Sequence, residues 1–146
     1  MPSEATTNTT QDDPKTPYYL LGGAPVFEAI AQRFYDLMES DPAYAELRAM
    51  HEDDLTPMRQ SLPLFLAGWA GGPREWFEQN PGKCMMSIHR GFRITPSSAA
   101  QWAGAMQRAI ADVAPRPVHV ANAMAEVLGD LCTAMISRDL RVSEKS

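Results

Sequence analysis

The chain has 146 residues, a formal net charge of −5 at pH 7 and 45% hydrophobic residues, which fits one globular domain with its own core. The acidic balance argues against a nucleic-acid partner, because phosphate contacts need a basic face. No apolar run approaches the ~20 residues of a membrane span. The N-terminus lacks a signal-peptide pattern, and two cysteines outside any CxxC pair suit a reducing compartment, so we expect a cytoplasmic protein.

The two ends of the chain differ from its middle. Residues 1–17 are rich in Ser, Thr, Asp and Pro and nearly free of large apolar groups, a composition typical of disorder. We therefore predict a disordered tail over 1–17, a folded domain over 18–140 and a frayed C-terminus over 141–146.

The first half of the domain has helical periodicity. A long helix is predicted after Gly22-Gly23, and N-cap residues followed by proline at Asp41-Pro42 and Thr56-Pro57 begin two more. The segment from Asp41 ends near Arg48, and Gly71-Gly72-Pro73 ends the helix that begins at Thr56. The apolar stripes of the two longer helices are Val26, Ile30, Phe34, Leu37 and Met38, and then Met58, Leu62, Phe65, Leu66 and Trp69.

The second half begins with a loop over Gly71–Gly82, which is long for a compact helical domain and is typical of a functional segment. Thr95-Pro96 and Pro117 then begin two helices. Their inward faces are predicted to be Ala99, Trp102, Met106, Ile110 and Val113, and then Val120, Met124, Val127, Leu128, Leu131 and Met135. No segment alternates like a strand, so the predicted fold class is all-α.

One histidine stands directly after the loop. His89 lies on what can be only a short helix ending near Gly91, whereas His119 begins the last helix and is expected at the surface. A lone histidine is usually structural, and the three histidines lack the HExxH spacing of a zinc hydrolase. The two cysteines are too few for a thiolate zinc site or an iron–sulfur cluster, and a single disulfide between them stays open.

The order of several landmarks resembles one family, the truncated hemoglobins, and within it group II. The resemblance covers residues 19–138 and predicts a two-over-two helical sandwich around heme b. Its landmarks are Gly22-Gly23, Arg33-Phe34-Tyr35, Glu52-Asp53-Asp54-Leu55, Phe65-Leu66, Gly71-Gly72-Pro73-Arg74, His89 with Phe92-Arg93-Ile94, and Trp102.

The resemblance assigns His89 as the axial ligand of the heme iron, which a neutral imidazole suits. The family often has an arginine before this histidine, where the chain has Ile88, and a Gly-His-Pro-Arg-type segment where it has Pro81-Gly82-Lys83-Cys84. The heme propionates therefore lose their usual partners, and the candidates are Lys83, Arg90 and Arg93. The side chains expected to line the heme pocket are Met58, Leu62, Phe65, Phe92 and Ile94.

Hydrogen-bond donors above the iron decide what such a site does. Dioxygen bound to heme iron carries partial negative charge, so donors stabilise it in a dry pocket. Tyr35 offers a hydroxyl and Trp102 an indole N–H, and the alternative for both is ordinary core packing. Where the family often has a tyrosine at the heme edge, this chain has Met50-His51, and we favour His51 as a third donor.

Several donors predict slow oxygen release. The family resemblance implies reversible binding of dioxygen, nitric oxide and carbon monoxide, and nitric oxide dioxygenation or peroxidase-like chemistry aided by a reductase. Slow release favours such reactions over oxygen transport. The alternative is a heme-based redox or gas sensor in which oxidation of Cys84 moves the segment of His89. Two further readings stay open, namely that His51 itself binds the iron and that the chain is a helical interaction module without heme.

Overall fold

The computed structural model describes residues 15–82 and 94–136, and no strand occurs in these two stretches. None of the described helices is both long enough and apolar enough to cross a membrane. The all-α prediction is confirmed. The elements are α2 (Pro17–Leu20), α3 (Ala24–Ser40), the 3-10 helix η1 (Pro42–Tyr44), α4 (Ala45–Ala49), α5 (Thr56–Trp69), α6 (Glu75–Gln79), α8 (Pro96–Val113) and α9 (Val118–Ala134).

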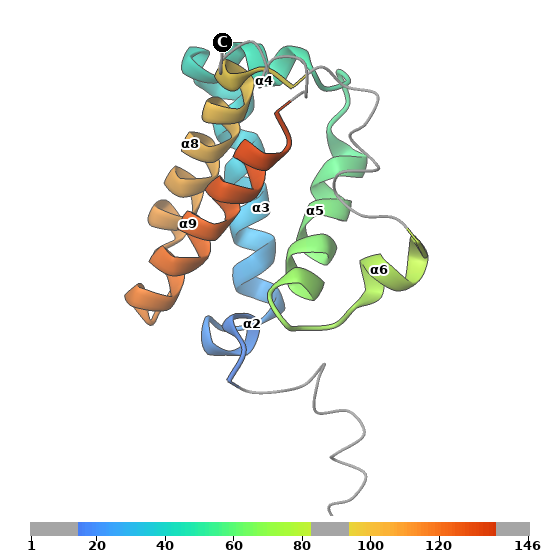
Figure 1. Ribbon diagram of the computed structural model, residues 1–146, viewed down its shortest axis with the longest axis vertical. Helices are drawn as coiled ribbons and strands as arrows, with labels where there is room; N and C mark the ends of the chain where they lie inside the picture. The colour runs from blue at the N-terminus through green and yellow to red at the C-terminus, as the bar shows by residue number, and fades with distance from the viewer. Residues whose placement is uncertain (1–14, 83–93, 137–146) are drawn as a thin grey trace, which may run out of the picture.

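Four long helices form two antiparallel pairs, as Figure 1 shows. Helix α3 packs against α5, and α8 packs against α9. Helix α3 also packs along α8, so it joins the two pairs, while α6 packs on α5. Helix α4 and η1 contact both α3 and α8 at the end of the molecule where α8 begins.

Side-chain caps are present at two of the predicted helix starts, Asp41 and Thr95, whereas α5 and α9 begin without one. The Thr95 hydroxyl oxygen accepts a hydrogen bond from Ser98 N at 2.9 Å, and Ser98 Oγ accepts one from Thr95 N at 3.0 Å, a reciprocal capping box. Asp41 Oδ1 accepts from Ala43 N at 2.9 Å at the start of η1. These bonds satisfy amide groups that lack partners within a first helical turn.

The core follows the predicted stripes apart from Met58 and Val127. Phe27, Ile30, Phe34 and Leu37 of α3 are all at most 2% exposed. Val127 of α9 was predicted to face inward but is 50% exposed. The inward face of α9 is set by residues spaced three or four apart, and Val127 falls outside that arc; its buried members are Ala121, Met124, Leu128 and Cys132.

Two boundaries differ from the sequence prediction. Pro17, placed in the disordered tail, begins α2, and Thr16 Oγ1 donates to the Gly71 carbonyl at 3.2 Å. These contacts with the end of α5 order the chain ahead of residue 18. The predicted loop over Gly71–Gly82 also contains a helix, α6, because Trp76 finds a buried position against Phe65.

The buried apolar residues fall into two clusters. The larger one fills the space among α3, α5, α8 and α9. The smaller one, which we call the second cluster, is made of Ile94, Ala99, Cys132, Met135 and Ile136. Trp102 of α8 packs against both clusters.

Candidate functional site

Tyr35 lies on the buried face of α3 and is 2% exposed. Its ring meets Phe34 edge-on at 5.0 Å and His51 at 6.2 Å between centroids. Burial raises the pKa of Tyr35 well above its usual value of 10, and the charge of Arg59 opposes that shift only in part. The hydroxyl therefore stays protonated at neutral pH. No hydrogen bond joins it to another described residue, so a buried donor stands without a partner within the described part of the chain.

Trp102 is the second predicted donor, and α8 brings it to the same region. Its ring meets the Phe34 ring edge-on at 5.3 Å, so Phe34 contacts both Tyr35 and Trp102. The indole is half-buried and packs against both apolar clusters. Within residues 15–82 and 94–136, its N–H donates no hydrogen bond.

His51 follows α4 and reaches the Tyr35 ring, with the two rings nearly perpendicular at 77°. Its Nδ1 lies 2.9 Å from the Leu47 carbonyl oxygen. Because a carbonyl can only accept, Nδ1 carries the proton in this contact. Met50, the alternative to His51, packs instead against the second cluster, as Trp102 does.

The predicted pocket-lining residues of α5 differ in their exposure to solvent. Leu62 and Phe65 are buried, and the Phe65 ring packs on Trp76 and Phe77 of α6. Met58 was predicted to share their apolar face but is 41% exposed, because it stands in the first turn of α5, ahead of the buried stretch from Leu62 to Gly68. Met58 is therefore no part of the core.

The remaining predicted site residues divide at residue 94. Ile94 is buried in the second cluster. The predicted axial ligand His89 lies outside the described residues, and so does Cys84 of the sensor alternative. The same holds for the lining residue Phe92 and for the propionate candidates Lys83, Arg90 and Arg93. His119 is exposed on α9, as predicted.

Cys132 is a free, buried thiol in the second cluster. Its Sγ donates to the Ala99 carbonyl at 3.2 Å, and burial raises its pKa to about 11. The thiolate needed for redox chemistry is therefore scarce at neutral pH, and Cys132 acts as a packing residue that joins α9 to α8.

Arg59 is a polar residue near Tyr35 that the sequence reasoning missed. It stands on α5, and its guanidinium carbon lies 5.8 Å from the centre of the Tyr35 ring. The same guanidinium binds Asp36 and Glu39 of α3. The signal was a polar stripe beside the apolar one on α3, since Gln32, Asp36 and Glu39 are spaced by four and three residues.

Glu46 is a second residue that the sequence reasoning missed. From α4, its carboxylate accepts hydrogen bonds from Thr95 Oγ1 at 2.8 Å and from Ser97 Oγ at 2.5 Å. Gln101 Oε1 accepts from Leu47 N at 2.9 Å. These bonds fix α4, which precedes His51, against the first turns of α8, which carries Trp102.

The described residues fit a heme in two respects. Tyr35 and Trp102 bring two donors to one Phe34 side chain, and neither donor has a hydrogen-bond partner among them, which suits a polar ligand between α3 and α8. Two separate apolar clusters, with Trp102 touching both, suit a flat apolar group. No group of three or more described His, Cys, Asp or Glu side chains is arranged to hold a metal ion directly.

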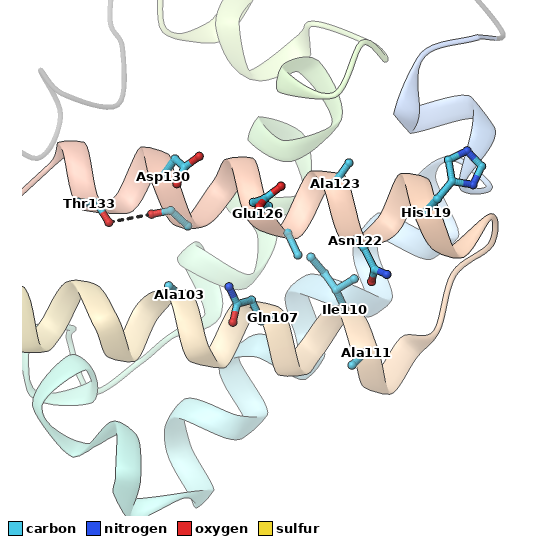
Figure 2. Close-up of a pocket in the computed structure, with 12 residues that line it drawn as sticks. Ala103, Gln107, Ile110, Ala111, His119, Asn122, Ala123, Glu126, Asp130 and Thr133 are labelled. Atoms are coloured by element: carbon cyan, nitrogen blue, oxygen red, sulfur yellow. Dashed lines mark hydrogen bonds between the residues drawn. The ribbon is translucent and has the colours of Figure 1, made fainter.

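A groove of about 890 Å³ lies elsewhere, between α8 and α9. The lining is mostly small or polar, and Figure 2 shows the Gln107 side chain pointing from α8 toward α9. Neither Tyr35, His51 nor Trp102 lines it, so it is distinct from the candidate site.

Known proteins resemble the chain over nearly all of the described part. Residues 16–137 match the family described as bacterial-like globin. A cold-adapted truncated hemoglobin from the Antarctic marine bacterium Pseudoalteromonas haloplanktis TAC125 is 32% identical over 85% of this chain and 99% of its own, with a TM-score of 0.80.

Two further solved structures agree. A thermostable hemoglobin from the actinobacterium Thermobifida fusca is 31% identical over 84% of this chain and 98% of its own, with a TM-score of 0.74. A group II 2-on-2 hemoglobin from the plant pathogen Agrobacterium tumefaciens is 25% identical over 84% of this chain and 94% of its own, with a TM-score of 0.79.

Proposed function

The chain belongs to the bacterial-like globin family, and from that premise we propose that it binds heme b through His89 and holds dioxygen under hydrogen bonds from Tyr35 and Trp102. When bound, the heme supplies the iron position at which a diatomic gas binds. The observation that carries the proposal is the pair of donors, both in edge contact with Phe34, that have no hydrogen-bond partner within residues 15–82 and 94–136. The resemblance to group II truncated hemoglobins supports it.

The chain's own residues then set how long the gas stays. The Tyr35 hydroxyl remains protonated, because burial raises its pKa, and it donates to the ligand. The indole N–H of Trp102 donates from α8. His51 lies against the Tyr35 ring at 6.2 Å and serves as a third polar group at the edge of the site. Hydrogen bonds to a partly charged acceptor are stronger than neutral ones, so release is slow.

The rest of the heme pocket is assigned in the same proposal. Apolar side chains cover the porphyrin faces and basic side chains hold the propionates. The first set is Met58, Leu62, Phe65, Phe92 and Ile94, and the second is Lys83, Arg90 and Arg93. Met58, which is 41% exposed, is assigned to the solvent edge of this lining.

Slow release favours reaction over delivery. Nitric oxide, dioxygen and one electron together give nitrate. A bound heme would supply that electron, and a cytoplasmic reductase would have to return it after each turnover. We propose this nitric oxide dioxygenation as the physiological reaction, with peroxidase-like chemistry as the alternative; carbon monoxide binds as a competing ligand.

The experiment compares oxygen dissociation by stopped flow in the wild type, Tyr35→Phe and Trp102→Phe. Loss of a hydrogen bond worth about 1.5–3 kcal/mol speeds release roughly 10- to 150-fold. Matched controls are Tyr44→Phe on η1 and Trp69→Phe at the end of α5, which should leave the rate unchanged. Equal rates in all five proteins contradict the donor role. A purified His89→Ala protein that keeps the wild-type heme spectrum contradicts the axial assignment.

A further inference from the structure

Arg59, whose side chain is 22% exposed, makes several side-chain contacts with α3. Its Nη2 lies 2.9 Å from Asp36 Oδ1 and 2.8 Å from Glu39 Oε1. Its Nη1 lies 2.7 Å from Gln32 Oε1 and 3.3 Å from the Gln32 carbonyl oxygen. One guanidinium on α5 therefore joins three residues spread over two turns of α3.

Those three residues surround Tyr35 on its own helix. Asp36 follows Tyr35 directly, and the guanidinium carbon of Arg59 lies 5.8 Å from the centre of the Tyr35 ring, within the range of a cation–π contact. Phe34 and His51 meet the same ring edge-on. Arg59 is the one cation for which a contact with the ring is recorded within the described residues.

The backbone of α5 gives a reason for this side-chain anchor. Pro63 lies inside the helix and has no N–H, so the carbonyl of Arg59 lacks its i→i−4 hydrogen bond. The first turn of α5 therefore loses one of the bonds that would fix it to the rest of the helix. The contacts of the Arg59 side chain with α3 hold that turn in place.

We propose that Arg59 is a positioning residue, which fixes the Tyr35 ring and the start of α5 against α3 and thereby aims the Tyr35 hydroxyl at the bound gas. The inference rests on the proposed function, because it presumes that Tyr35 donates to the ligand. In this proposal Arg59 makes no direct contact with the gas. Its effect must therefore pass through Tyr35.

The test is a double-mutant cycle on the heme-loaded protein. Arg59→Met keeps the length of the side chain and removes the charge and the donors. Oxygen dissociation and the C–O stretching frequency of the carbon monoxide complex are measured for the wild type, Arg59→Met, Tyr35→Phe and the double variant. The matched control is Arg33→Met, which removes an exposed pair between α3 and α8, with Arg33 Nε 2.8 Å from Asp112 Oδ2.

We expect Arg59→Met to speed oxygen release about 2- to 10-fold and to shift the C–O stretch, as coupled neighbours do. In the Tyr35→Phe background the same substitution should change neither quantity. Arg33→Met should leave both at wild-type values. Equal effects of Arg59→Met in the two backgrounds, or no effect in either, overturn the inference while the donor role of Tyr35 stands.

The outcomes separate the inference from the proposed function. If Tyr35→Phe alone leaves oxygen release unchanged, the proposed donor role fails, and this inference fails with it. If Arg59→Met does not fold, the variant Asp36→Asn with Glu39→Gln loosens the same contacts from α3 and keeps the cation. It should move both readouts in the same direction through Tyr35, and wild-type values in that variant would overturn the inference.

Discussion

Tyr35 illustrates how a residue can be kept for function at the expense of stability. Its hydroxyl is buried and has no hydrogen-bond partner among the described residues. A buried donor of this kind costs about 1–3 kcal/mol in desolvation. Such a group is typical of a ligand-binding site, since the bound ligand supplies the missing acceptor.

The stability of Tyr35→Phe tests this reasoning. Because the substitution removes an unpaired polar group and keeps the ring, we expect the heme-free variant to be equal to the wild type or more stable by up to about 1 kcal/mol. Urea denaturation followed by circular dichroism measures the difference. A loss of more than about 1 kcal/mol would mean that the hydroxyl has a partner in the folded protein.

Gly72 shows the opposite situation, in which the smallest side chain is required by packing. A Cβ atom added at this position would overlap the ring of Tyr18. Gly104 of α8 is the matched control, because a Cβ there would meet only Tyr44 Cε1 at 3.8 Å.

We predict opposite signs for the two alanine substitutions. Gly72→Ala should destabilise the protein by about 1–3 kcal/mol through overpacking. Gly104→Ala should stabilise it by roughly 0.5–1 kcal/mol, because alanine loses less backbone entropy within a helix. Thermal unfolding of both variants gives the comparison, and a neutral Gly72→Ala would contradict the close contact with Tyr18.

At the scale of elements, the start of α8 links two parts of the site. Thr95 caps α8 and also donates to Glu46 of α4. Hydrogen bonds from Ser97 first, and then from Thr95, hold the pKa of Glu46 below its usual 4.5. The carboxylate is therefore the form that the folded protein prefers.

The lowered pKa of Glu46 determines how stability depends on pH. Because the folded pKa lies below the unfolded one, the contribution of Glu46 is fully present above about pH 4.5 and is lost as the pH falls through the lowered value. We expect wild type to melt above Glu46→Gln at pH 6–7 and the two to converge toward pH 3. Exposed Glu126→Gln on α9 is the control, and a difference that stays constant with pH would contradict the prediction.

Helix α6 and Val127 are two places where the sequence pattern gave a wrong prediction. The segment 71–82 contains Gly and Pro at both ends, which predicted a loop, yet Trp76 and Phe77 pack on Phe65 and support a short helix. Val127 has an apolar side chain and near-helical spacing, yet it is 50% exposed. Both results depend on which neighbours are available, and a sequence pattern does not contain that information.

At the scale of the whole molecule, the buried apolar residues form two separate clusters. The second cluster is small and depends on the ends of α8 and α9, and a heme seated beside Trp102 would add apolar contacts to both. A ligand that binds only the folded state stabilises it by mass action.

Heme loading should therefore raise the melting temperature. At a free heme concentration 100 times its dissociation constant the gain is about 2.7 kcal/mol, or roughly 5–10 °C for a chain of this size. Differential scanning calorimetry of heme-free and loaded protein measures it. His89→Ala should reduce the gain, and identical melting temperatures with and without heme would contradict heme binding to the folded state.

The sequence by itself determined the helical class, the starts of the long helices and most of the core. These depend on local signals, such as the Thr95-Pro96 cap and the spacing of Ile30, Phe34 and Leu37, that each segment carries without its neighbours. The resemblance of the sequence to a known family also predicted Tyr35 and Trp102 as hydrogen-bond donors.

Only the tertiary structure decided how these residues meet. It placed Phe34 in contact with both Tyr35 and Trp102, and Arg59 against Tyr35 from another helix. It also joined Glu46 to Thr95, although 49 positions separate them. Such contacts arise when helices pack against one another, so their partners are fixed by the relative placement of whole helices and not by the spacing of residues along any one of them.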